Sequence, residues 1–205
     1  MKTIWYYIKQ AMIPAVYLIF MAMTAMGIAM ISDANLVWLK AVLSVLNLGL
    51  YGFIVAATSY KDGQTALKVR IANDLERMQI IKTGEDRPLK LREEYKAWKG
   101  FMSGIVTCLP CLLLLIVHTI LVFCVNPAYN GAGAAAGFLY MVFFIFVRLG
   151  VDIAAPSVYL YYFTLVSFAV IPLMTGIPYV LGARKIELQQ QKIKEKQRQI
   201  YGDKA

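Results

Sequence analysis

The chain of 205 residues is 60% hydrophobic and only 16% charged, whereas soluble domains carry roughly 25% charged residues. This composition leaves no room for a large soluble domain and predicts an all-α integral membrane protein. The formal net charge of +9 does not indicate nucleic-acid binding, because basic residues beside membrane spans face anionic lipid headgroups on the cytoplasmic side.

Four apolar segments are long enough to cross a bilayer, which takes about 20 residues of helix. The first is too long for the apolar part of a signal peptide, so we expect an uncleaved helix. A tight turn at 32–35 separates it from the second, and Asn126-Pro127 ends the third. The predicted spans are residues 12–31, 36–60, 101–125 and 159–181.

The hydrophilic segment 61–99 follows the second span. Leu67, Ile71, Leu75 and Met78 recur at helical spacing, which predicts an amphipathic helix over 64–82 that continues the second span. Glycine and proline then end it, and a shorter amphipathic helix over 89–99 leads into the third span. We expect a cytoplasmic helical hairpin, serving either as a structural connector or as a docking platform for a partner.

The segment 138–149 is strongly apolar but spans only about 18 Å as a helix, against a hydrocarbon core of about 30 Å. A small-residue loop is expected before it, over 128–137. If the segment crosses the membrane, there are five spans and the chain ends lie on opposite sides. If it is re-entrant or interfacial, there are four spans and both ends share a side.

Charge decides between the two arrangements. Four spans place 19 of the 21 Lys and Arg residues on one side. Five spans would place the seven cations of the tail outside, which the positive-inside rule disfavours. We therefore predict four spans and an outer hairpin over 138–156. The freed backbone groups of that hairpin must be buried in protein or face water.

Within the tail, 182–205, residues 182–201 are predicted to form a basic helix that extends the last span. Ile186, Ile193 and Ile200 recur every seven residues, which is half of a coiled-coil seam. The basic side chains suit an anionic membrane surface, or form a solvated flank that stops translocation. The residues concerned are Lys185, Lys192, Lys194, Lys196 and Arg198.

The sharpest local motif is Cys108-Leu109-Pro110-Cys111. Two thiols at this spacing can cycle between dithiol and disulfide, and over these four residues the motif resembles thioredoxin-like redox sites. The alternative is that both cysteines are small apolar residues in a membrane helix. The third cysteine, Cys124, completes no disulfide framework.

Four polar side chains in or near the apolar segments are candidate functional residues. Asn47 can contact a substrate or form an interhelical hydrogen bond. His118 shares a helix face with Cys111 but has no carboxylate donors in the spans, so helix packing is favoured over a metal site. Arg148 and Asp152 can form an ion pair if the segment that contains them is helical. At membrane depth such a pair indicates a functional role, whereas at the interface it only anchors the segment.

No catalytic constellation is present in the sequence, and we expect neither an enzyme nor a cofactor. The leading hypothesis is a non-enzymatic subunit or scaffold of the plasma (inner) membrane, with both termini cytoplasmic. It would contact anionic lipid and form a homo-oligomer or join a partner membrane subunit. The alternatives are a small transporter or channel near the outer segment, and a thiol oxidoreductase using Cys108 and Cys111.

Overall fold

The computed structural model describes residues 2–31, 36–84, 95–126, 131–150 and 158–201, and every regular element within them is a helix. The predicted all-α class is thus confirmed. The elements are α1 (Lys2–Ala29), α2 (Val37–Thr83), α3 (Trp98–Cys124), α4 (Gly131–Leu139), α5 (Met141–Gly150), a 3₁₀ helix η2 (Val158–Val166) and α6 (Ser167–Tyr201).

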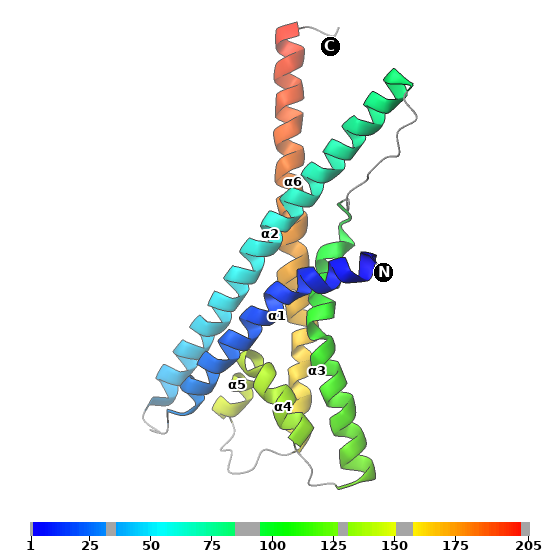
Figure 1. Ribbon diagram of the computed structural model, residues 1–205. Helices are drawn as coiled ribbons and strands as arrows, with labels where there is room; N and C mark the ends of the chain where they lie inside the picture. The colour runs from blue at the N-terminus through cyan, green and yellow to red at the C-terminus, as the bar shows by residue number, and fades with distance from the viewer. Residues whose placement is uncertain (1, 32–35, 85–94, 127–130, 151–157, 202–205) are drawn as a thin grey trace.

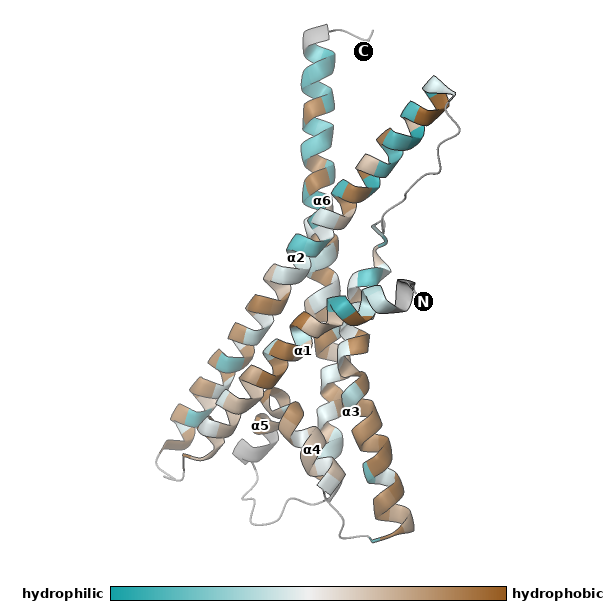
Figure 2. Ribbon diagram, viewed as in Figure 1, coloured by the Kyte–Doolittle hydropathy of each residue, from teal (hydrophilic) through white to brown (hydrophobic). Residues whose placement is uncertain are grey.

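Four of the helical segments are long and apolar enough to cross a membrane. They contain the four predicted spans, apart from a few residues at the segment ends. Apolar residues cover much of their length (Figure 2), and large apolar side chains such as Phe20, Phe53 and Phe123 are 60%, 72% and 74% exposed. Side chains of this kind are stable on a helix surface that faces lipid.

Two of these helices are much longer than a span. At 47 residues, α2 is about 70 Å long, more than twice the thickness of a hydrocarbon core. Beyond the bundle, α2 and α6 project as two diverging helical arms (Figure 1), which we call the α2 arm (61–83) and the α6 arm (182–201). The predicted helices over 64–82 and 182–201 are confirmed as continuations of their spans.

The second helix of the predicted cytoplasmic hairpin, over 89–99, is only partly described by the structure. Residues 85–94 lie outside the described part of the chain. Of the helix expected over 89–99, residues 95–97 are not helical and α3 begins at Trp98. For residues 95–97 the prediction was wrong.

The arms begin where α2 crosses α6. A Cβ added at Gly63 would overlap the carbonyl group of Tyr179, and one added at Gly182 would overlap the carbonyl of Tyr60. Each helix therefore presents a glycine to the backbone of the other, the kind of close approach that small residues permit. The crossing fixes the direction in which both arms leave the bundle.

The apolar segment predicted as an outer hairpin forms part of a helical pair. The helices α4 and α5 are joined at Tyr140 and pack among α1, α2, α3 and η2, at the end of the bundle away from the arms (Figure 1). Residues 141–145 are all at most 4% exposed, so α5 begins inside the bundle. Whether the pair is re-entrant stays a prediction, and residues 151–156 lie outside the described chain.

The small-residue loop expected over 128–137 was wrong for residues 131–137, which are the body of α4. The glycines there favour a loop by their conformational freedom, which weakens the helix preference of the alanines between them. Tertiary packing overrides this tendency, because Gly133 and Gly137 lie against the ring of Tyr161 where a larger side chain would collide or crowd.

Candidate functional site

Asn47 connects the first two spans. Its Nδ2 atom donates to the carbonyl oxygen of Met21 at 3.0 Å, and its Oδ1 atom accepts from the hydroxyl of Thr24 at 2.8 Å. Asn47 is 8% exposed. The amide is therefore used on both sides in joining α1 to α2, which is the interhelical role that the sequence favours for it.

The two cysteines of the Cys-Leu-Pro-Cys motif are completely buried on α3. The Cys108 thiol donates to the carbonyl oxygen of Ser167 at 3.5 Å, and the Cys111 thiol donates to the hydroxyl of Thr164 at 3.3 Å. Both thiols are free. Each is directed at the start of the last span, and the pair is enclosed where a soluble redox partner has no direct access.

Next to the thiols lies a group of buried tyrosines. The hydroxyl of Tyr140 donates to the carbonyl oxygen of Thr107 at 2.7 Å, which fastens the α4–α5 junction to α3. Tyr51 is completely buried, and its hydroxyl has no hydrogen-bond partner among the described residues. The ring of Phe143 meets Tyr51 edge-on at 6.3 Å between centroids, so aromatic packing holds the ring in place.

His118 is completely buried near the C-terminal end of α3. Its ring meets Tyr161 edge-on, with centroids 5.6 Å apart, and Tyr162 at 5.9 Å. A Cβ added at Gly133 would lie 2.8 Å from the His118 ring. No group of three or more potential metal-ligating side chains occurs among the residues described, and the observed contacts are those of a packed aromatic side chain.

Arg148 and Asp152 cannot be compared with the prediction. Arg148 lies on α5, but its side chain is outside the described part of the structure, and Asp152 is among the residues not described.

At the base of the arms, the first residues of α1 and α3 meet. Lys99 is only 3% exposed, and its Nζ atom lies 4.8 Å from the centroid of the Tyr6 ring. The ring of Trp98 lies 5.7 Å from that of Tyr7. A cation–π contact of this kind lowers the cost of holding a lysine away from water.

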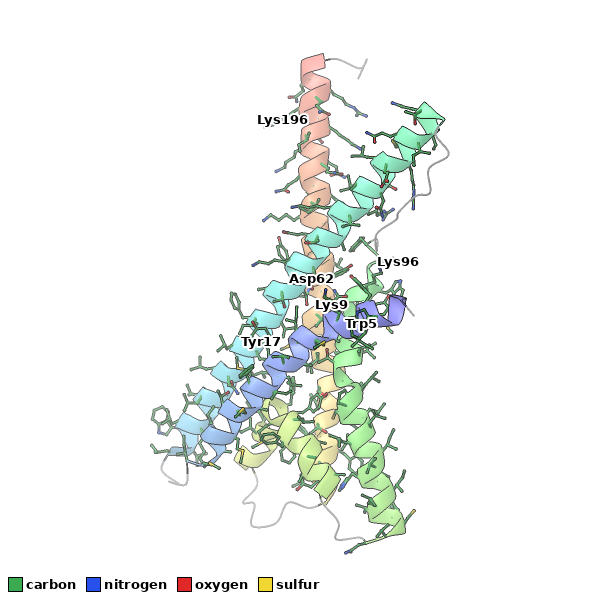
Figure 3. All side chains as sticks on the ribbon, in the orientation of Figure 1. Trp5, Lys9, Tyr17, Asp62, Lys96 and Lys196 are labelled. Carbon is green, nitrogen blue, oxygen red and sulfur yellow. The ribbon has the colours of Figure 1, made fainter. Side chains whose placement is uncertain are left out.

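Two titratable side chains, Asp62 and Tyr95, also lie near this junction. Asp62, which Figure 3 shows at the level where the helices converge, is partly buried with the side chain of Gln10 beside it, and burial raises the pKa of its carboxyl group. Tyr95 stacks on Tyr179 with centroids 5.5 Å apart. Burial raises the pKa of Tyr95, and the nearby Glu187 carboxylate raises it further.

Above the junction the arms touch and then separate. Leu67 of the α2 arm packs against Ala183 and Ile186 of the α6 arm. Beyond this contact a groove of about 390 Å³ opens between the arms. Its lining residues are Ile71, Asp74, Leu75 and Met78 from the α2 arm, and Gln190, Ile193, Lys194 and Gln197 from the α6 arm.

The groove exposes apolar side chains. Leu75 is 58% exposed, Met78 61% and Ile193 56%, and Ile81 just beyond is 80% exposed. Asp74, the only carboxylate among the described residues that line the groove, forms an ion pair with Arg77 at 3.3 Å. Polar groups therefore rim an apolar floor.

The five basic residues predicted to face lipid are all exposed on the α6 arm, and one of them, Lys194, lines the groove. Lys185 is closest to the bundle, with its Nζ atom 5.9 Å from the centroid of the Tyr60 ring. The other four lie farther along an arm that points away from the spans (Figure 3, where Lys196 is labelled). Their contact with a membrane surface stays a prediction.

The sequence did not single out the groove or the junction as sites. The apolar spacing of the α2 arm was visible, and so was the isoleucine repeat of the α6 arm. Nothing local indicates that the two lie opposite each other, or that Lys99 and Asp62 meet residues of α1. No known protein family, curated protein or solved structure matches this chain.

Proposed function

We propose that this protein is a non-enzymatic subunit or scaffold of the inner membrane, which associates with a partner through its spans and its two arms. In this proposal the arms and both chain ends face the cytoplasm, as the distribution of Lys and Arg favours.

The apolar floor between the arms is the observation that carries the proposal. A Leu, Ile or Met side chain gains roughly 1.5–3 kcal/mol when it is moved from water into a packed interior. Leu75, Met78 and Ile193 remain more than half exposed in the groove, on helices that extend beyond any membrane-spanning length. Rimmed apolar surface of this kind is typical of an interaction site.

The polar groups inside the spans also support a structural role. The Asn47 amide, the Tyr140 hydroxyl and the two buried thiols form hydrogen bonds to neighbouring helices. The alternatives gain no comparable support. The transport hypothesis rested on Asn47, Arg148 and Asp152; the Asn47 amide is hydrogen-bonded to α1, and the other two side chains are outside the described structure. Redox exchange needs thiols within reach of a partner.

Purification from native membranes in a mild detergent tests the proposal. We expect the chain, which has a mass of 23.0 kDa, to elute with a stoichiometric second chain or as a homo-oligomer. Cross-linking in intact membranes before extraction controls for dissociation by detergent. A lone monomer under both conditions would contradict the proposal.

A further inference from the structure

We propose that the groove between the arms binds an amphipathic helix of a partner protein, and that the polar face of this helix is acidic. The inference rests on the proposed function and specifies the chemistry of the partner.

The shape of the groove matches a helix. Its apolar residues on α2 follow helical spacing, and Ile71 to Met78 cover about 10 Å of arm, or two turns. Ile193 faces them from the α6 arm. A partner helix can therefore place apolar residues from successive turns on this floor, in the helix-in-groove mode of recognition.

The net positive charge of the two arms favours an acidic occupant. Over residues 68–82 and 187–198 the arms carry eight Lys and Arg side chains against four Asp and Glu. In the lining itself, Asp74 is already paired with Arg77, whereas Lys194 is exposed on the rim. An acidic helix complements this field, while the arms of a second copy would bring the same cationic excess and be repelled.

The position of the groove disfavours lipid as the occupant. If the span ends at residue 181, residues 190–197 lie about 14–24 Å beyond it along the helix axis. The headgroup region extends only about 5–8 Å beyond the hydrocarbon core. The groove therefore lies in the aqueous phase, where a protein helix can reach it and a lipid headgroup cannot.

A binding measurement with full-length protein in nanodiscs of neutral lipid tests this. The probe is a fluorescent amphipathic peptide of about 18 residues, long enough to form several turns, with Leu on one face and Glu on the other. The comparison peptide has Lys in place of each Glu. We expect the acidic peptide to bind at least about tenfold more tightly than the basic one, in a salt-dependent way.

Matched variants locate the binding. Ile193→Asp places a charge on the floor and Lys194→Glu reverses a rim charge, so each should weaken binding of the acidic peptide by about tenfold or more. Leu188→Asp is the control, because Leu188 is 49% exposed on the same arm but does not line the groove. Since all three positions are exposed, the fold should persist, and elution volume and helical content verify this. Ile193→Ala provides a milder variant that keeps the helix.

Three results would overturn the inference. The first is equal binding of both peptides, and the second is equal weakening by Leu188→Asp and Ile193→Asp. The third comes from a photo-crosslinker placed at Met78: cross-linking of two copies of this chain, or cross-linking only to lipid in anionic vesicles. If the native partner still co-purifies while the peptide fails to bind, the inference fails and the proposed function stands. If the protein is a lone monomer in native membranes but binds the acidic peptide, the proposed function fails and the groove's preference for an acidic helix stands.

Discussion

Asn47 and Cys108 illustrate how polar atoms are held inside this bundle. Each is buried in a span, and each uses its polar atoms on a neighbouring helix. In lipid no water replaces a missing partner, so hydrogen bonds of this kind restrict which helix faces can meet. The interhelical role of Asn47 could be predicted from its position alone, because an amide in mid-span has few other partners. The surroundings of Lys99 could not, since Tyr6 lies 93 residues earlier in the sequence.

The burial of the cysteines predicts their reactivity. In folded protein a small maleimide should label Cys124, which is exposed, whereas Cys108 and Cys111 should react only after denaturation because both are completely buried. Mass spectrometry of labelled peptides measures this, and Cys124→Ser serves as the control that should abolish labelling of the folded protein. Rapid labelling of Cys111, or a reversible disulfide with Cys108, would favour the oxidoreductase alternative.

The packing of the helices in this fold depends on glycines that allow one helix to approach another closely. Gly63 and Gly182 permit the crossing of α2 and α6, and Gly133 permits α4 to approach the ring of Tyr161. The helices themselves follow from apolar length and spacing, and were largely predictable. The helix over residues 131–137 was not, because its glycines weaken the helix preference of its alanines, and the aromatic surface that it packs against is not visible in the sequence.

The crossing of the arms predicts different outcomes for two glycines of the same helix. Gly63→Ala should destabilise the folded protein by about 1–3 kcal/mol or more, because the new Cβ would overlap the carbonyl of Tyr179. Gly49→Ala should be neutral or stabilising by up to about 1 kcal/mol, since nothing lies within 4 Å of its Cβ. Reversible unfolding in mixed micelles measures both changes. Equal tolerance of the two substitutions would argue against the close crossing.

The whole molecule has a bundle at one end and two diverging arms at the other (Figure 1). The described beginning of α1 lies on the side of the bundle from which the arms project, as the four-span arrangement requires. Because the α6 arm continues the last span in the same direction, the described end of α6 lies beyond that side as well. The chain thus combines an apolar body with a basic, partly apolar extension.

The sidedness of the membrane protein is the prediction at this scale. A fluorescent protein that matures only in the cytoplasm should fluoresce when fused to either chain end, because 19 of the 21 Lys and Arg residues lie on that side in the four-span arrangement. A phosphatase that is active only outside should be silent at both ends and active when inserted at residue 130. Activity of the two reporters at opposite ends would restore the five-span alternative.

The sequence by itself determined the helical class, the four apolar segments and the continuation of two of them as arms, because composition and periodicity act locally along the chain. The tertiary structure decided where Lys99 and Asp62 lie, how deeply α5 is buried, and that the apolar face of one arm opposes that of the other. Those facts depend on contacts between residues far apart in sequence, and on glycines whose role is visible only against the backbone or side chain that each one faces.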